Sequence, residues 1–230
     1  MISYGQFCPV AQALEIIGER WTLLVIRELL CGNYRFNQIL NGVPLMSRSL
    51  LAQRLRSLEE AGLVERRERG EGRTGTEYCL TPAARELEPI VMGLGVWGTR
   101  WARRDMTPEE RDPVLLMWDL HRNLHIDRLP AKQTVVAFWL RDVEAKRSRY
   151  WLRIQKPEVE LCLTNQGFEE NLRVETTARA MIDVWMGHRE LAQAIRSKAI
   201  DIQGAPGLVR DFPKWLKLNV FAGVPRPETV

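Results

Sequence analysis

Lysine is absent from the chain until Lys132, so arginine supplies every cation of the first half. The planar fork of arginine suits two-bond contacts to bases and phosphates better than the point charge of lysine does. A high-GC codon bias would produce the same absence, and we take that as the simpler cause. The formal net charge of +4 does not by itself indicate a nucleic-acid partner. The distribution is more informative, because residues 35–73 carry eight arginines against five glutamates.

Cysteine and histidine are also scarce. The four cysteines, at positions 8, 31, 79 and 162, show no C-x-x-C spacing, which argues against a disulfide framework and a zinc site. Among the three histidines, His121 and His125 lie four residues apart on an expected helix and offer one metal alternative. Arg122 occupies the position where the zinc-protease pattern requires glutamate. We therefore favour an ordinary helix face and expect no bound metal.

Enzyme and membrane motifs are missing as well. The chain has no G-x-S-x-G elbow, phosphate loop or dinucleotide fingerprint. No apolar run reaches the roughly 20 residues that span a bilayer, and the N-terminus lacks the basic and apolar regions of a signal peptide. A chain of 230 residues that is 45% hydrophobic and 27% charged is ordinary for one or two globular domains. The sequence predicts a cytoplasmic protein that is not an enzyme, needs no cofactor and does not span a membrane.

Residues 47–61 are expected to form a helix with two different faces. Ser47 can cap its start and Gly62 can end it. Helical spacing gives one buried stripe, which consists of Leu51, Leu55 and Leu58. The opposite face carries hydrogen-bond donors followed by an acid, in the order Ser49, Gln53, Arg56 and Glu60. Donors of this kind contact bases and phosphates, whereas glutamate repels phosphate, so the N-terminal half is expected to enter the major groove. A core helix with a solvated polar face is an equally consistent interpretation.

The segment after this helix predicts a β-hairpin, with strands at residues 63–67 and 77–80. Glycines between the strands permit turn conformations, and Arg69 and Arg73 are expected at the tip. A basic, glycine-rich tip suits a wing that follows phosphates or the minor groove. Glu68 and Glu71 in the same loop favour the alternative, a solvated hairpin.

Together these segments resemble the HxlR-type winged-helix regulators of bacteria and archaea, relatives of the MarR group. The resemblance rests on pieces that occur in order: Cys8-Pro9, Gly18–Thr22, Arg35-Phe36, Leu51–Leu58, Ala61–Val64 and Tyr78–Thr81. It implies a winged helix-turn-helix over residues 1–104 and a homodimer that binds palindromic double-stranded DNA. The candidate DNA contacts are Arg35, Ser47, Arg48, Ser49, Gln53, Arg54, Arg56, Arg69 and Arg73.

The resemblance implies that the N-terminal helix and the helix after Thr81 hold the dimer together. Thr81 can cap this second helix, and Pro82 suits its first position. Its apolar stripe consists of Leu87, Ile90, Val91, Leu94, Trp97 and Trp101. The stripe fits either the domain core or a dimer interface, and we favour the interface.

Cys8 precedes Pro9 at the start of the first expected helix, where a helix N-terminus lowers the pKa of a thiol and raises its reactivity. The resemblance implies a redox or electrophile sensor in some relatives and a cysteine without a redox role in others. The sequence shows no acid-base partner nearby, so both interpretations stay open.

The second half of the chain is predicted to form a separate domain. A polar connector is expected at residues 105–112, and a capping box at residues 107–110 predicts a helix from there to about Leu124. The domain, residues 113–225, is expected to have strands at 134–140, 150–154, 159–163, 171–175 and 200–203. Helices are expected at 177–186 and 189–197 and after Pro206. Strands followed by helices predict an α+β fold.

From Leu172 onward this half resembles the sterol-carrier-protein-like lipid-binding fold. The matching features are a strand, the Trp185-Met186-Gly187 turn, an Ala-rich helix, Ile200–Gly204 and a last helix with Leu208, Phe212 and Trp215. The resemblance implies an apolar tunnel for a lipid-like or aromatic ligand. The candidate pocket residues are Phe138, Trp139, Leu161, Met181, Trp185 and Phe212, although most aromatic residues at such spacings are simply core.

These observations predict a dimeric, DNA-binding transcriptional regulator that responds to an apolar small-molecule effector in its C-terminal half. The rival interpretation is a lipid carrier or hydrolase that uses the winged-helix half only as a dimerisation scaffold. Steep salt dependence of DNA binding would separate the two, because phosphate neutralisation releases counterions.

Overall fold

The computed structural model describes residues 3–68, 75–102 and 106–225. It divides the chain into two compact units, Met1–Gly98 and Thr99–Val230, which are described separately below. Both helices and sheets are present, so the expected α+β class is confirmed. Within the described ranges, no helix is long and apolar enough to cross a membrane.

The first unit begins with four helices: α1 (Pro9–Ile17), α2 (Thr22–Leu30), α3 (Phe36–Gly42) and α4 (Arg48–Glu60). Residues at helical spacing on these helices meet in one core, which contains Val25, Ile26, Leu29, Ile39, Leu51, Leu55 and Leu58. Helix α3, the short segment after it and α4 form a helix-turn-helix.

Helix α4 forms as its sequence predicts. The Ser47 hydroxyl accepts a hydrogen bond from the backbone N–H of Leu50 at 3.2 Å, which caps the helix. Gly62 follows the last turn with a φ of +70°, in the left-handed region that glycine adopts without strain. The predicted stripe of Leu51, Leu55 and Leu58 is buried.

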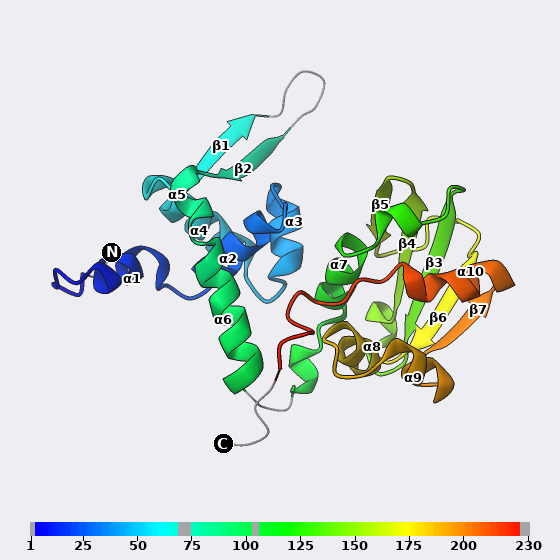
Figure 1. Cartoon of the computed structure of the whole chain (residues 1–230). Helices are drawn as coiled ribbons and strands as arrows, with labels where there is room; N and C mark the ends of the chain where they lie inside the picture. The colour runs from blue at the N-terminus through cyan, green and yellow to red at the C-terminus, as the bar shows by residue number, and fades with distance from the viewer. Residues whose placement is uncertain (1–2, 69–74, 103–105, 226–230) are drawn as a thin grey trace. The chain divides into compact units, whose positions relative to one another are not determined.

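A two-stranded antiparallel hairpin follows, with β1 (Val64–Glu68) and β2 (Thr76–Leu80). In Figure 1 it extends away from the helices of its unit. Its base is buried at Val64 and the opposite residue Leu80, whereas the rest of β1 is exposed. Strand β2 is half-buried, and the backbone N–H of Tyr78 donates to the carbonyl of Tyr34 at 2.8 Å. The expected wing tip, with Arg69 and Arg73, lies outside the described residues.

The expected single helix after Thr81 is wrong, because the structure has two helices, α5 (Pro82–Arg85) and α6 (Glu88–Trp101). Pro89 explains the break. It lacks the N–H that would bond to the Arg85 carbonyl, and its ring would collide with that carbonyl. The chain therefore turns after Arg85, and a new helix starts with Pro89 in its first turn.

The second unit starts with a short 3-10 turn, η1 (Pro108–Glu110), and then α7 (Pro113–Arg122). The expected capping box is present, because the Thr107 N–H donates to Glu110 Oε2 at 3.0 Å, but the expected single helix from there to about Leu124 is wrong. Pro113 disfavours helical geometry at Asp112, so the helix restarts there, and Asp112 caps it by accepting from the backbone N–H groups of Val114 and Leu115.

The centre of this unit is a five-stranded sheet in the order β5-β4-β3-β6-β7. Its strands are β3 (Thr134–Leu140), β4 (Arg149–Gln155), β5 (Glu158–Cys162), β6 (Leu172–Thr176) and β7 (Asp201–Gly204). The pair β3 and β6 is parallel, and the other neighbours are antiparallel. All five strands lie within two residues of the expected positions.

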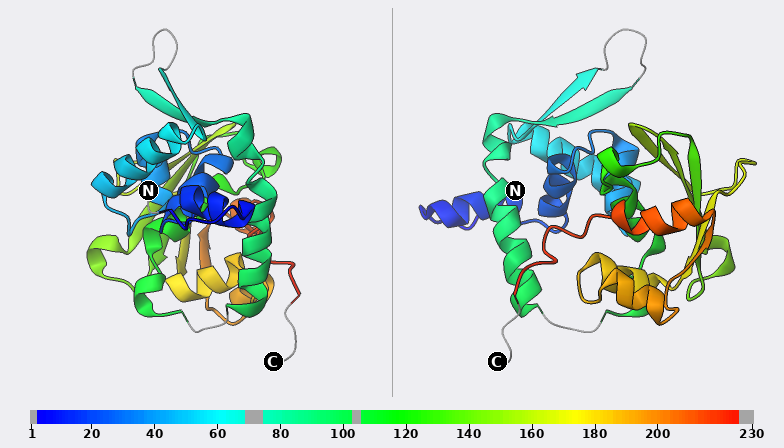
Figure 2. Two further views of the ribbon diagram at one scale, coloured as in Figure 1. Left: turned by 90° about the vertical axis from the view of Figure 1, so that its left-hand side faces the viewer. Right: turned by 45° about the vertical axis from the view of Figure 1, so that its right-hand side comes forward.

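The helices α7, α8 (Ala178–Trp185), α9 (Leu191–Arg196) and α10 (Pro206–Asp211) pack on one face of this sheet. Figure 2 shows them on one side of the strands. Further 3-10 turns are η2 (Ile126–Arg128), η3 (Ala145–Arg147) and η4 (Phe212–Lys214). The other face has a small separate cluster that consists of Val135, Ala137, Trp151 and Cys162, with Trp139 and Phe168 against it.

Candidate nucleic-acid interface

The exposed face of α4 carries the three polar side chains that the sequence places opposite the leucine stripe. Ser49, Gln53 and Arg56 are all exposed, on the side opposite the buried leucines. Within the described ranges, neither Gln53 nor Arg56 has a side-chain hydrogen bond or ion pair to another protein group. Their donors are therefore available to a ligand, which matches the sequence expectation for this face.

The start of α4 presents two hydroxyls and one guanidinium. The Ser47 and Ser49 hydroxyls lie 3.1 Å apart, and Ser47 is also occupied as the helix cap. The Arg48 guanidinium lies 5.1 Å from the centre of the Phe36 ring, at the start of α3. This contact connects the two helices of the helix-turn-helix at the end where DNA is expected.

Arg54 is engaged by the protein itself. Its guanidinium forms an ion pair with Glu19 and donates to the Arg20 carbonyl at 3.2 Å. Its side chain is only 13% exposed. These contacts hold α4 against the segment before α2, a role that the sequence pattern did not suggest.

Arg35 lies in the loop before α3, and its side chain is about half exposed. Its Nε lies 3.9 Å from Glu77 Oε1 on β2, which is at the edge of ion-pair distance. Its backbone N–H donates to Gln38 Oε1 at 3.1 Å, so the backbone here is held by the first turn of α3. The guanidinium remains accessible beside the hairpin.

The sequence reasoning did not single out Arg66. This exposed residue lies on β1 opposite Tyr78, and the described part of the chain offers it no carboxylate partner. Its neighbour Arg67, in contrast, is held by Glu65 at 2.7 Å. Strand alternation puts Glu65 and Arg67 on one face and Arg66 on the other, and that period-two pattern could have identified it.

Cys8 occupies the N-terminal position of α1 and is partly exposed. Hydrogen bonds from the backbone N–H groups of Ala11 and Val10 lower the pKa of its thiol below the ordinary value. Among the described residues, the cysteines form no disulfide, and no group of three possible metal ligands occurs.

The two histidines of the metal alternative are not on one helix, because α7 ends at Arg122 and His125 lies beyond it. His121 Nδ1 donates to the Trp118 carbonyl at 2.5 Å, since a carbonyl only accepts. Burial lowers the pKa of His121. The ring is therefore neutral at neutral pH and belongs to the packing of α7.

The six candidate pocket residues of the second unit do not line one cavity. Phe138 and Trp139 are neighbours on β3, so their side chains lie on opposite faces of the sheet. Phe138, Met181 and Phe212 are packed in the core, with ring centres of Phe138 and Phe212 6.2 Å apart. Trp139 instead contacts the guanidinium groups of Arg149 and Arg173, 4.4 and 3.9 Å from its ring centre. The single pocket that the sequence predicted is therefore wrong.

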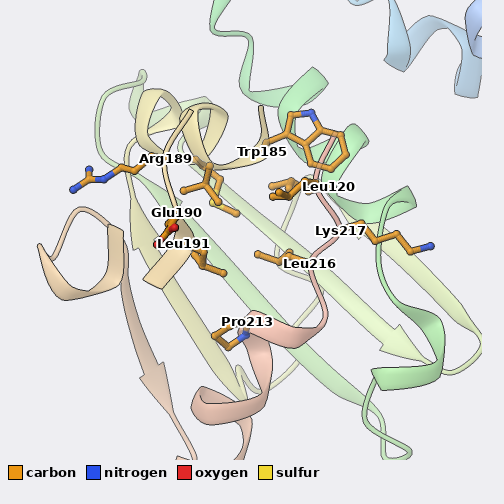
Figure 3. Close-up of a pocket in the computed structure, with 11 residues that line it drawn as sticks. Leu120, Trp185, Arg189, Glu190, Leu191, Pro213, Leu216 and Lys217 are labelled. Atoms are coloured by element: carbon orange, nitrogen blue, oxygen red, sulfur yellow. The ribbon is translucent and has the colours of Figure 1, made fainter. Parts of the chain in front are cut away.

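A different cavity, of about 290 Å³, opens on the helical side of the sheet (Figure 3). Met181 and Trp185 are the two candidates that line it, and Leu161 does not. Its other apolar walls come from α7, α8, α9 and the segment after α10, with side chains of Leu120, Val184, Leu191, Pro213, Leu216 and Leu218. The charged residues Arg189, Glu190 and Lys217 also border it. In Figure 3 Arg189 and Lys217 extend away from the apolar centre.

Comparison with known proteins identifies the first unit. The model of a family described as "HxlR-like helix-turn-helix" matches residues 16–106. YvaP of Bacillus subtilis (strain 168), an uncharacterized HTH-type transcriptional regulator, is 34% identical over 101 residues, which cover 44% of this chain and 94% of that protein. The chain belongs to the HxlR-like helix-turn-helix family.

Other relatives match a similar share of this chain, and the first unit is called the HxlR-like unit from here on. An uncharacterized HTH-type transcriptional regulator of Synechocystis sp. is 33% identical over 101 residues, which cover 44% of this chain and 75% of that protein. The reduced form of the transcriptional regulator YodB from B. subtilis is 29% identical, and its match covers 44% of this chain and all of that chain. The TM-score of this match is 0.38.

The family match ends near the end of α6, so it covers the HxlR-like unit and leaves the sheet of the second unit outside. The match supports the winged helix-turn-helix that the sequence predicted for the N-terminal half. This half is an HxlR-like unit, of the kind found in helix-turn-helix transcriptional regulators. The function of the second unit has to be argued from its own residues.

Proposed function

We propose that this chain is a dimeric transcriptional regulator that inserts the N-terminal half of α4 into the major groove of DNA. The observation that carries this proposal is the exposed face of Ser49, Gln53 and Arg56 on the second helix of an HxlR-like helix-turn-helix. Among the described residues, the side chains of Gln53 and Arg56 have no hydrogen-bond or ion-pair partner on this face. Glutamine and arginine can each make paired contacts to base edges.

Charge along α4 supports this direction of insertion. Ser47, Arg48 and Ser49 lie at the start of the helix, where backbone N–H groups also point outward and attract phosphate. Glu59 and Glu60 are exposed at its other end and would repel phosphates. Arg35 and Arg66 flank the helix from the adjoining loop and hairpin, in reach of the DNA backbone in this arrangement.

The proposed dimer uses apolar faces that the first unit leaves uncovered. On α6, Ile90, Leu94, Trp97 and Trp101 recur at helical spacing and are between 47% and 59% exposed. On α1, Val10 and Leu14 are exposed as well, and so is Phe7 just before the helix. A monomer rarely leaves such apolar stripes in water, and a second copy of the same stripes would bury them. Two copies would present two α4 helices to a palindromic site.

The decisive experiment titrates the protein against the DNA upstream of its own gene, and against a random duplex, at several salt concentrations. The proposal expects specific binding whose log K falls steeply and linearly with log salt, because each neutralised phosphate releases counterions. A lipid carrier or hydrolase with a helix-turn-helix scaffold would show no preference for the operator duplex. Absence of that preference at every salt concentration would overturn the proposal.

A ligand-sensing role for the second unit rests on its cavity and on the resemblance to sterol-carrier-like folds. The cavity is apolar at its centre and borders Trp185. Its volume of about 290 Å³ is at the lower limit of ligand pockets. At roughly 30 Å³ for each water-sized group, it would hold about ten non-hydrogen atoms. We therefore propose a small apolar effector that is well below the size of a sterol and that shifts the population between two states of the regulator.

A further inference from the structure

One carboxylate in the HxlR-like unit is completely buried. Glu28, on α2, has 0% exposure. Its Oε1 accepts from Arg27 Nε at 3.0 Å and from Arg27 Nη2 at 2.7 Å, and its Oε2 accepts from Asn33 Nδ2 at 2.6 Å. A buried charge is costly unless it is paired and hydrogen-bonded in this way.

The same network holds the end of α3. Arg27 Nη2 also donates to the carbonyl of Gly42, the last residue of α3, at 2.9 Å. Gly42 approaches so closely that a Cβ atom there would lie 2.0 Å from Glu28 Oε2. Only glycine fits at this position, so the carboxylate sets how near the end of α3 comes to α2.

The network also holds the loop before α3. The Asn33 amide group binds the Glu28 carboxylate, and the Asn33 backbone N–H donates to the Glu28 carbonyl at 3.0 Å. Two residues later the loop reaches Arg35, a candidate DNA contact. Four residues after Gly42, Met46 leads into the Ser47 cap of α4. One carboxylate therefore holds both chain segments that lead to the proposed DNA contacts.

Stability alone does not account for a charge in this place. A buried ion pair adds little net stability compared with apolar side chains of similar volume, and its best-attested benefit is a unique geometry. We propose that Glu28 is a positioning residue for DNA recognition, which fixes the Arg35 loop and the turn before α4 relative to each other. The inference rests on the proposed DNA-binding function.

The test compares Glu28→Gln, Asn33→Ala and Gly42→Ala with the parent chain, and Glu86→Gln on the exposed end of α5 is the matched control. Operator and random-duplex affinities are measured at a temperature at which circular dichroism shows each variant folded, together with its Tm. The parent must first prefer the operator, and failure at that step would overturn the proposed function instead of this inference.

We expect each network variant to lose at least tenfold in operator affinity and less than threefold in random-duplex affinity, so that the specificity ratio falls. The control keeps the parental ratio. Asn33→Ala keeps the buried ion pair and serves as the test should Glu28→Gln fail to fold. A purely structural role predicts a lower Tm with an unchanged specificity ratio, and that result would overturn the inference.

A double variant sharpens the test. In Glu28→Gln alone, the new amide N–H₂ would face the Asn33 N–H₂, so the Asn33 amide would have to turn over to offer its oxygen, and the carboxylate that pairs with Arg27 is lost. Adding Asn33→Asp supplies an acceptor and restores the net charge of the network. We expect the double variant to recover at least half of the lost specificity on a logarithmic scale. Further loss in the double variant would contradict positioning through this hydrogen bond.

Discussion

At the residue scale, neighbours decide what an arginine or a cysteine can do. Arg54 and Arg56 are two positions apart on α4, yet Glu19 and the Arg20 carbonyl hold the first while the second faces solvent. The thiols of Cys8 and Cys162 differ in the same way, because backbone N–H groups at the start of α1 lower the pKa of Cys8 whereas burial raises the pKa of Cys162. The same side chain therefore has a different role at each position.

The two arginines predict opposite outcomes on substitution. Arg56→Ala should cost about 1–3 kcal/mol of operator binding, as a lost paired base contact does, with an unchanged Tm. Arg54→Ala should cost about 1 kcal/mol of stability, because a partly buried ion pair and a hydrogen bond are lost. Thermal unfolding and DNA titration of both variants measure the contrast. Equal operator affinity for Arg56→Ala and the parent would rule out the proposed docking face.

Cys8 should react at lower pH than Cys162, whose pKa is raised by burial. The hydrogen bonds from the Ala11 and Val10 N–H groups stabilise the thiolate, so the alkylation midpoint for Cys8 should shift downward. Iodoacetamide labelling over a pH series, with each peptide quantified by mass spectrometry, compares the two thiols in one sample. A common midpoint would exclude an activated Cys8. Redox sensing would further require that oxidation of Cys8 changes operator affinity, which Cys8→Ser should prevent.

At the element scale, the packing of whole helices separates structural from interacting faces. No residue of α6 is buried, although the helix is rich in large apolar side chains. Helix α7, by contrast, buries Leu116, Met117 and Leu120 against the sheet of its unit. An apolar stripe in the sequence predicts burial in both cases, but only the second is buried within the chain.

The exposed stripe on α6 should hold the dimer. Trp97→Arg should yield a folded monomer, because Trp97 is 59% exposed and contributes little to the core of its own unit. Its operator affinity should fall at least tenfold, since a monomer presents one α4 helix to the operator and a dimer presents two. Sedimentation velocity measures the change, and Leu163→Arg, at an exposed residue of the second unit, is the control. An unaltered sedimentation coefficient for Trp97→Arg would remove this face from the interface.

The packing of α7 should make the second unit sensitive to acid. Burial lowers the pKa of His121 below its ordinary value of 6.5. Above that value the ring is neutral in both states. As the pH falls below it, the unfolded chain takes up the proton first, so the free energy of unfolding decreases. Urea unfolding at about pH 8 and pH 5.5 measures the free energy of unfolding. Between these pH values it should decrease less for His121→Asn than for the parent. An equal decrease in both, with His125→Asn as control, would contradict this assignment.

At the scale of the whole molecule, the proposal couples a DNA site in one unit to a ligand cavity in the other. If an effector changes the affinity for DNA by some factor, DNA must change the affinity for the effector by the same factor. The relevant cavity is the one beside Trp185, so tryptophan emission should report its occupation.

A small apolar probe such as indole or cyclohexanol should shift the tryptophan emission and change operator affinity. Leu191→Trp should fill part of the cavity and abolish both effects, while Leu163→Trp, away from it, should leave both intact. DNA titrations with and without probe, and probe titrations with and without DNA, should give the same coupling factor. Probe binding with unchanged DNA affinity would make the second unit a binding module that does not regulate.

The sequence by itself determined the local elements and the family. Periodicities of 3.6 and 2 residues, caps such as Ser47 and the glycine at position 62 act over a few residues, so they predicted α4, the hairpin and all five strands of the sheet. Ordered short motifs indicated the HxlR-like family. Pro89 already indicated the break in the helix after Thr81. The continuous apolar stripe favoured a single helix instead.

Only the tertiary structure decided which of these residues act together. The engagement of Arg54 by Glu19 and the cavity under the segment after α10 both join positions far apart in the chain. The Glu28 network is of the same kind, because Arg27, Asn33 and Gly42 meet only when α3 packs on α2. Periodicity reports which face of an element is apolar, and it contains no information about which side chain will lie opposite.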